Sequence, residues 1–273
     1  MKLMFFCPRW GSADVPVEVF AEKVKGADYD GVELSLPFDD QPFQKRILKA
    51  LEGQGLAFIA QHHETANPDP GAYLDEYRRR LESLAAARPL FVNSQTGKDW
   101  FSFDQNRKLI DAARAISAKS GVTILHETHR GKFSFNAQTT AKYLAADPDL
   151  RIAADFSHWC VVSESLLEDQ TEAVSLAISR ADHIHARVGY PEGPQVSDPR
   201  APEWRPALDA HLGWWDKIVD AHKKKGTPAL TVTPEFGPAP YMPTLPHTGM
   251  PLASQWEVNV YMMGLLRERY RSI

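Results

Sequence analysis

Apolar residues along the chain follow two alternating kinds of spacing. Short apolar runs bounded by polar residues, glycine or proline are typical of buried strands, and segments with apolar residues every three or four positions are typical of amphipathic helices. The short runs predict strands at residues 2–7, 31–36, 56–62, 90–94, 122–126, 151–155, 182–188 and 229–233. The segments with helical spacing lie at residues 15–25, 42–54, 73–88, 103–120, 136–146, 164–180, 207–225 and 256–270.

Eight strand–helix units in alternation predict an α/β fold with an all-parallel sheet and its helices outside. This number of units favours a (β/α)8 TIM barrel over an open doubly wound sheet. The turn after the first strand reads C-P-R-W-G-S and lacks the glycine-rich pattern of a dinucleotide-binding open sheet. No domain boundary is visible, so we expect one barrel domain over residues 1–273.

Two proline-rich segments are longer than the other predicted connections. They follow the seventh and eighth strands, at residues 189–206 and 237–254. In a TIM barrel these connections lie on the face that carries the active site. Loops of this length are often functional, so we expect them to form a lid or a contact between subunits of a homo-oligomer.

Composition narrows the class of protein. The chain has 273 residues, with 31 basic and 35 acidic side chains and no basic block, which argues against binding to nucleic acid. Its two cysteines cannot form a disulfide framework, and they indicate a reducing compartment. The N-terminus lacks the apolar stretch of a signal peptide, and no apolar run approaches the roughly 20 residues that span a bilayer. The expectation is therefore a cytoplasmic protein that does not associate with membranes.

Carboxylates and a histidine stand at the carboxyl ends of four consecutive strands. Glu127 follows the fifth strand, Asp155 ends the sixth, His185 lies in the seventh and Glu235 follows the eighth. Strand ends in a barrel surround one point, so these side chains are expected to converge. Three carboxylates at close range need a cation or a shared proton. Together with one imidazole they suit Mn²⁺, Mg²⁺, Co²⁺ or Zn²⁺, and the sequence predicts a divalent metal centre.

The same residues suggest acid–base chemistry. Glu127 and Glu235 would lie on opposite sides of a bound sugar, so that one removes a proton from a C–H group and the other returns it through an enediolate. A metal would acidify that C–H group. His158 and Arg187 are suited to bind the developing oxyanion. His129 either orients Glu127, binds a substrate hydroxyl, or is a solvated loop residue.

Three weaker substrate-binding candidates complete the set. Glu33 either points into the barrel mouth or pairs with a basic residue beneath it. His62 and His63 are adjacent, so only one can face the barrel axis. The apolar residues before them favour His62. Trp10 either walls the pocket, where a sugar can stack on its ring, or packs in the core.

These motifs resemble the xylose isomerase-like TIM-barrel superfamily, which includes sugar isomerases and epimerases, inosose dehydratase-like proteins and nucleases of the endonuclease IV type. The resemblance covers the whole chain and rests on G-V-E-L, L-H-E-T, A-D-F-S-H, H-I-H-A-R and P-E-F-G. It implies that the metal ligands are Glu127, Asp155, His185 and Glu235, with Mn²⁺ as the first choice of ion. It also implies that the two glutamates are the acid–base pair and that His158 and Arg187 bind substrate oxygens.

The first functional hypothesis is a metal-dependent isomerase or epimerase of a sugar or sugar derivative. The segments T-H-R-G-K-F-S-F-N and Y-P-E-G-P-Q-V-S-D-P-R differ from characterised epimerases. The alternative is therefore a metal-dependent lyase, dehydratase or hydrolase of a keto-sugar or cyclitol. A nuclease of the endonuclease IV type fits the acidic balance poorly, and a non-catalytic sugar-binding protein is the remaining alternative. The expected partner in each favoured case is a small carbohydrate.

Overall fold

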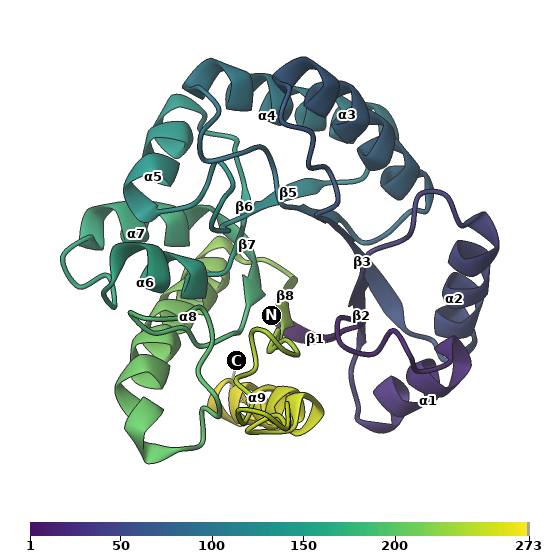
Figure 1. Cartoon of the computed structure of the whole chain (residues 1–273). Coiled ribbons are helices and arrows are strands. Elements are labelled where there is room, and N and C mark those ends of the chain that lie inside the picture. The colour runs from purple at the N-terminus through teal and green to yellow at the C-terminus, as the bar shows by residue number, and fades with distance from the viewer. Residues whose placement is uncertain (272–273) are drawn as a thin grey trace.

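The chain folds into a closed barrel of eight parallel strands, which confirms the predicted fold class (Figure 1). The computed structural model describes residues 1–271. The strands are β1 (Lys2–Pro8), β2 (Gly31–Leu34), β3 (Ala57–His62), β4 (Val92–Ser94), β5 (Ile124–Glu127), β6 (Ile152–Ala154), β7 (Ala181–His185) and β8 (Ala229–Thr233). Each strand pairs with the next, and β8 pairs with β1 to close the barrel.

Helices surround the barrel and bury their apolar faces against it (Figure 1). They are α1 (Val17–Gly26), α2 (Gln41–Gly53), α3 (Pro70–Ala86), α4 (Phe103–Ser120), α5 (Ala137–Ala146), α6 (Ser157–Ser163), α7 (Thr171–Arg180), α8 (Arg205–Lys225) and α9 (Gln255–Arg269). A 3-10 turn, η1 (Pro202–Trp204), leads into α8. Within the part of the chain that the structure describes, no helix has both the length and the apolar character needed to cross a membrane.

Capping interactions define where several helices begin. At the start of α4 the Ser102 hydroxyl accepts a hydrogen bond from the Gln105 amide, and the Gln105 side chain accepts one from the Ser102 amide. This reciprocal pair is a capping box, which satisfies two amides that the helix leaves unpaired. Asp40 and Asn136 cap α2 and α5 in a simpler way.

The helix predicted at 164–180 is wrong in its first part. Residues 164–170 are a connection between α6, which lies soon after β6 and ends at Ser163, and α7, which begins only at Thr171. Asp155 turns the chain by accepting a hydrogen bond from the Ser157 amide at 3.1 Å. The α6 sequence is short and contains two valines, which favour strands, so its pattern did not indicate a helix.

The barrel interior is built in two layers. The lower layer is a compact apolar cluster of Phe6, Ile59, Phe91, Leu125 and Ala153. Two residues further along the strands, the inward side chains become polar, because alternate residues of a strand face the same side. This upper layer includes Glu33, Asn93, Glu127, His185 and Thr233, all buried. The apolar layer thus supports a polar layer at the carboxyl ends of the strands.

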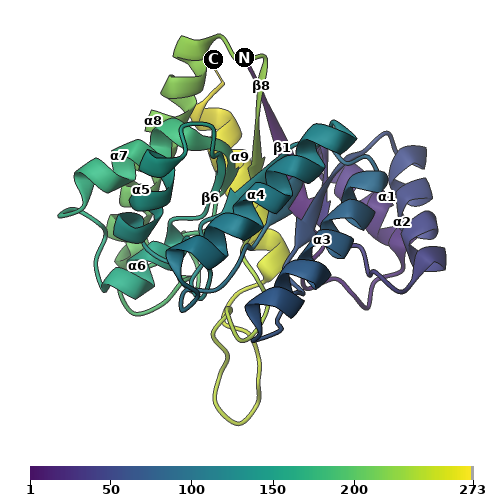
Figure 2. The same ribbon diagram turned by 90° about the horizontal axis from the view of Figure 1, so that it is seen from above.

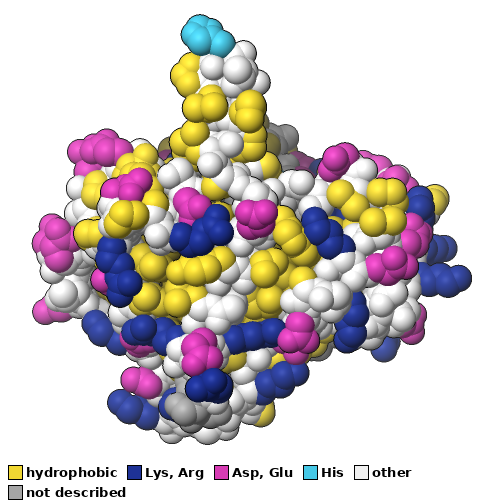
Figure 3. Space-filling view, turned by 90° about the horizontal axis from the view of Figure 1, so that it is seen from below, with side chains coloured by type: hydrophobic (Ala, Val, Ile, Leu, Met, Phe, Trp, Pro, Cys, Tyr) yellow, Lys and Arg dark blue, Asp and Glu magenta, His cyan; other side chains and the backbone are white. Residues whose placement is uncertain are grey.

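The connection after β8 forms a hairpin that stands away from the barrel (Figure 2). Thr244 and Pro251 pair across it, and the Leu245 amide donates to the Met250 carbonyl at 2.7 Å. Apolar side chains lie along the projection (Figure 3), and those of Leu245, Met250 and Leu252 are about half exposed. One of the two long loops expected from the sequence is therefore an extended arm.

The turn after β4 offers a test of how tightly the loops at the barrel mouth are packed. Gly97 has a φ of +67°, and a Cβ atom there would lie 2.0 Å from the Asn106 side-chain oxygen. Asn106 is buried and holds the backbone carbonyls of Lys98 and Phe101, so it cannot move freely. Gly121 at the end of α4 has a similar φ of +73°, but open space around it.

We predict that Gly121→Ala lowers the free energy of unfolding by about 1–2 kcal/mol, the cost of a left-handed backbone for alanine. Gly97→Ala should cost about 1–3 kcal/mol more, because the added methyl group overpacks the Asn106 site. Denaturant titration of both variants measures the difference. Equal losses would contradict the packing of this turn.

Candidate metal centre and cavity

A cavity of about 620 Å³ opens at the carboxyl ends of the strands. Ligand-binding pockets typically measure about 300–1,000 Å³, so it can hold a small molecule. Its wall includes Glu127 and His129 from the end of β5 and the connection after it, Arg187 from the connection after β7 and Glu235 from the connection after β8. The opposite part of the wall comes from the connections after β1 and β2.

The structure brings together the four side chains that the sequence suggested as metal ligands. One ligand atom from each of Glu127, Asp155, His185 and Glu235 lies within 4.8 Å of all the others. His185 Nδ1 is 3.9 Å from Glu127 Oε1, 3.9 Å from Asp155 Oδ2 and 2.8 Å from Glu235 Oε2. All four residues are at most 4% exposed. The cluster is therefore enclosed and has a single imidazole nitrogen among three carboxylates.

The charges of this cluster are unbalanced in a way that fits a cation. Burial raises the pKa of Glu127 to about 8; His185 opposes the shift, and Glu235 and Asp155 add to it. Burial also raises the pKa of Asp155, against the attraction of Arg187 and His185. Burial alone would lower the pKa of His185, but the carboxylates of Glu235, Glu33 and Glu127 raise it well above the ordinary value. The protein alone must bind protons here, which a divalent ion can replace.

The orientation of His185 also fits a metal ion. Its Nδ1 atom is enclosed without an aligned hydrogen bond, although Glu235 is close. Once it has lost its proton, an imidazole nitrogen that faces three carboxylate oxygens offers its lone pair where a cation would bind. Oxygen and imidazole donors together suit Mn²⁺, Mg²⁺, Co²⁺ and Zn²⁺. The residues present therefore fit a divalent metal centre.

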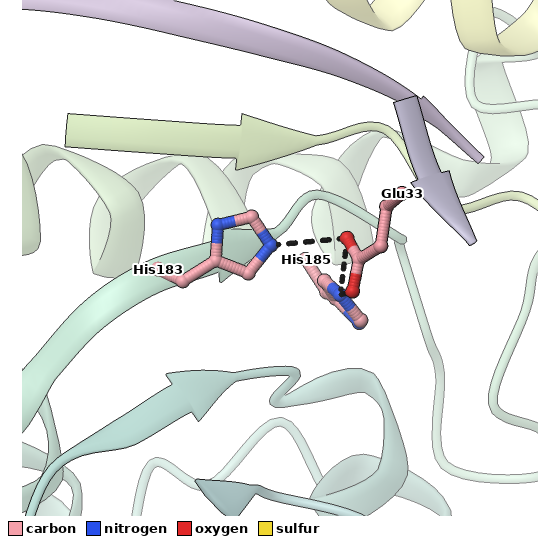
Figure 4. Close-up of side chains that lie close together, drawn as sticks. All are labelled: Glu33, His183 and His185. Atoms are coloured by element: carbon pink, nitrogen blue, oxygen red, sulfur yellow. Dashed lines mark hydrogen bonds and ion pairs between the residues drawn. The ribbon is translucent and has the colours of Figure 1, made fainter. Parts of the chain in front are cut away.

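Glu33 does not line the cavity, which corrects the expectation of a substrate contact. It lies beneath His185 and accepts hydrogen bonds from His183 Nε2 at 3.2 Å and His185 Nε2 at 3.0 Å (Figure 4). Asn93 and Thr233 donate to the same carboxylate at 2.9 Å and 2.6 Å. Burial acts against its charged form, but His185 and His183 hold the pKa of Glu33 well below its usual range. Its partners are histidines, not a lysine or arginine.

This carboxylate fixes the tautomers of both histidines. A carboxylate can only accept, so the Nε2 atom of each ring carries the proton that is donated to Glu33. His183 completes the pattern, because its Nδ1 lies 2.7 Å from the Thr231 hydroxyl, which can donate to it. For His185 the consequence is that Nδ1 is left to face the cluster. A carboxylate behind a ligating histidine is the common arrangement at protein metal sites.

Two amide side chains that were not among the predicted site residues hold the acid–base candidates. Asn93 Nδ2 lies 3.0 Å from Glu127 Oε2, and Gln61 Nε2 lies 3.0 Å from Glu235 Oε1. A signal was present: each is two residues beyond an apolar side chain of the barrel interior, Phe91 and Ile59 respectively. Following that alternation along β3 and β4 would have placed both amides at the mouth.

The prediction that His62 faces the barrel axis is wrong, because the phase of the inward–outward alternation along β3 differs from the predicted one. His62 lies outside the barrel, bonded to Ser94 at 3.2 Å and Thr65 at 2.8 Å, and its ring packs on Tyr77 of α3 at 5.2 Å. His63 lines the cavity instead. Ile59, not its neighbours, points into the barrel, so the inward positions are the odd-numbered ones.

Arg187 and the two loop histidines form the next part of the site. Arg187 lines the cavity and is bonded to Asp155, to Ser157 Oγ at 3.1 Å and to His158 Nε2 at 2.8 Å. His158 itself lies behind Arg187 and not on the wall, whereas His129 is on the wall. The two rings are in contact, with centroids 3.8 Å apart and their planes tilted by 45°. Burial lowers the pKa of His129 and of His158 well below the usual range, so both rings are neutral hydrogen-bonding groups.

Aromatic side chains cover the mouth of the cavity. Trp10 lines the wall, one of the two places that the sequence left open for it, and meets Tyr241 edge to face at 4.9 Å. The Arg187 guanidinium lies 4.8 Å from the Tyr241 ring. Tyr241 comes from the loop after β8, and nothing in the hydrophobic pattern marks it. This loop therefore supplies both the aromatic cover and the projecting hairpin.

No protein-family model matches the chain, and no curated protein matches its sequence. Solved structures do match. They include the 3-keto-D-glucoside 4-epimerase YcjR from E. coli, with a TM-score of 0.63 and 13% identity over 98% of this chain and 100% of that one. A D-allulose 3-epimerase from Methylomonas sp. in complex with D-allulose has a TM-score of 0.62 and 16% identity over 98% of each chain.

A third match is a xylose isomerase domain containing protein from Salmonella typhimurium LT2, with a TM-score of 0.58 and 13% identity over 98% of this chain and 97% of that one. At such identities the common feature is the fold. The resemblance that the sequence motifs indicated is thereby confirmed at the level of architecture. The chain has the fold of the xylose isomerase-like TIM barrels.

Proposed function

We propose that the protein is a divalent-metal-dependent isomerase or epimerase of a sugar or sugar derivative. The observation that carries the proposal is the enclosed cluster of three carboxylates and one imidazole, two of whose carboxylates also line the cavity. The fold adds support, because two of the similar structures are epimerases of a keto-glucoside and of D-allulose.

Glu127, Asp155, His185 and Glu235 would hold the ion, with Mn²⁺ as the first choice. When bound, a divalent ion would polarise substrate oxygens as a Lewis acid and so acidify the neighbouring C–H group. The chain itself must then supply a group that takes the proton and another that returns it.

The two glutamates are suited to these opposite roles. Burial acts to raise the pKa of Glu235, but His185 and Arg187 outweigh it and hold that pKa below its usual value, so this carboxylate is ready to accept a proton. In the absence of an ion the pKa of Glu127 is raised to about 8, so of the two carboxyl groups Glu127 holds a proton more readily and is suited to return one. Environments that give two neighbouring carboxyl groups such different pKa values are typical of an acid–base pair. Proton removal by one and return by the other passes through an enediolate of the substrate.

Neighbouring side chains keep the pair in place. Gln61 donates to Glu235, and Gln95 approaches Glu127 at 3.4 Å. Arg187 lies on the wall 3.5 Å from Glu235, where its charge can stabilise a substrate oxyanion. A lyase or dehydratase would share the first proton removal. Release of water or of another leaving group, in place of solvent exchange at carbon, would indicate that alternative.

We predict that Glu235→Gln lowers the rate at which solvent deuterium replaces the substrate C–H proton by about 10²–10⁴-fold, because the amide cannot accept the proton. The measurement is NMR of ketoses, keto-glycosides and inososes in D2O with Mn²⁺-loaded protein. Glu192→Gln, at an exposed position of the loop after β7, is the matched control and should exchange at the wild-type rate. Wild-type exchange by Glu235→Gln would contradict the mechanism.

Metal binding should strengthen as the pH rises, because the ion must displace the protons bound at Glu127 and His185. Both pKa values are raised in the folded protein, so the stability that these groups give the metal-free form is lost as the pH rises toward about 8. The increase in Tm caused by Mn²⁺ should therefore grow from about pH 6 to about pH 9. An increase that is constant or shrinks over this range would contradict the assignment.

Glu33→Gln should weaken Mn²⁺ binding by about 10–100-fold, because an amide does not fix the His185 tautomer as a carboxylate does. Titration followed by EPR of free Mn²⁺ gives the affinity. Thr231→Val is the control: it removes the hydroxyl that bonds His183 and leaves the contact between Glu33 and His185. If Glu33→Gln binds Mn²⁺ as tightly as the control, the carboxylate does not position His185.

A further inference from the structure

Two arginines line the cavity, and they differ in how their charge is compensated. Arg187 is paired with Asp155 and bonded to Ser157 and His158. Among residues 1–271, Arg9 has no acidic partner, and its one hydrogen bond goes from Nη2 to the Val15 carbonyl at 3.2 Å. Its Nη1 atom is enclosed and has no partner at all.

The surroundings of Arg9 increase the cost of this charge. The side chain is 9% exposed and lies with its guanidinium 4.8 Å from the Phe20 ring and 5.9 Å from the Phe43 ring. Burial lowers the pKa of Arg9, an effect that Asp14 opposes. The rings give some cation–π stabilisation, but they accept no N–H···O bond. A buried charge without an ionic partner is unfavourable, and a ligand anion would relieve it.

Arg9 stands in a different sector of the cavity from the metal centre. It follows β1, and the lining from β2 and the connections after β1 and β2 includes the apolar Trp10, Leu34 and Phe43 together with Asp40, whose carboxylate caps α2. The carboxylate cluster comes from β5 to β8. A ligand whose negative group lay among those carboxylates would be repelled. One that extends across the apolar wall would place its negative end at Arg9 and its reacting carbon near Glu127 and Glu235.

We infer that the substrate is an anionic sugar derivative whose oxyanion, a carboxylate or a phosphate, is bound by Arg9. The inference rests on the proposed function for the identity of the reacting end. It goes beyond it in naming the chemical class of the other end. The planar guanidinium, which lies near the Phe20 and Phe43 rings, suits oxyanions of both kinds, because it offers parallel N–H donors.

The test compares neutral and anionic forms of the same sugar. D-Glucose, D-galactose and D-mannose, their uronates and their 6-phosphates are titrated into Mn²⁺-loaded protein by calorimetry. In the wild type, at least one anionic form should bind at least about tenfold more tightly than its neutral parent, as expected for a charge-assisted hydrogen bond. The uronate and phosphate arms show which oxyanion is preferred.

Arg9→Met should remove that preference and leave binding of the neutral sugars within about twofold, because methionine keeps an apolar stem against the Phe20 and Phe43 rings. Arg130→Met is the matched control: this arginine stacks on the Tyr241 ring at 5.0 Å and does not line the cavity. It should keep the preference. Arg9→Lys retains the charge without the planar fork and should keep only part of it.

The inference is overturned if no anionic sugar binds the wild type more tightly than its neutral parent. It is also overturned if the preference persists in Arg9→Met, whatever the result with Arg130→Met. Mn²⁺ affinity, measured on every variant, shows that the centre is intact. The wild-type comparison stands even if Arg9→Met does not fold. Failure of the proposed function would show separately, as absence of Mn²⁺ binding or of C–H exchange in the wild type.

Discussion

Three carboxylates enclosed within a few ångströms of one another are the constraint on which this structure depends. Glu127, Asp155 and Glu235 are at most 4% exposed, so water cannot screen their repulsion. The protein offsets the charge with His185 and Arg187, and the raised pKa of Glu127 shows that the offset is incomplete without protons. A divalent ion would complete it. The same imbalance that makes the cluster costly to fold makes it a strong metal site and separates the two glutamates into acid and base.

The barrel supplies the precision that such a cluster needs. Its apolar layer fixes the strands, and the next inward side chains form a polar layer in which Glu33 orients His185 and Asn93 joins Glu33 to Glu127. The metal-ligand candidates therefore lie at the ends of strands and are held by buried hydrogen bonds, whereas the loops shape the cavity. The loops after β1 and β2 add an apolar wall and one uncompensated arginine. A reaction centre on one side and an anion site on the other would together hold an elongated substrate in one orientation.

The sequence was sufficient for the barrel and for the four residues of the cluster, because both follow from the period of the pattern. Buried parallel strands are short apolar runs, and their carboxyl ends meet in space whatever the loops do. The predictions were wrong where the position of a residue depends on the phase of the alternation or on tertiary contacts. The pattern alone favours an inward His62, because both faces of β3 carry apolar residues and the sequence does not show which face is inside. Helix α6, the partners of Glu33 and the placing of Tyr241 depend on contacts between distant segments, which no local pattern contains.

The central claim is that Glu127, Asp155, His185 and Glu235 bind a divalent ion, and the metal content of the protein tests it most directly. Protein purified without a metal-affinity column and analysed by mass spectrometry for metals should carry about one divalent ion per chain, or take it up when Mn²⁺ is added. Replacing Asp155 by asparagine, which leaves the acid–base pair in place, should lower that content. Wild-type protein that is free of metal, and stays so after Mn²⁺ and Zn²⁺ are offered, would contradict the account.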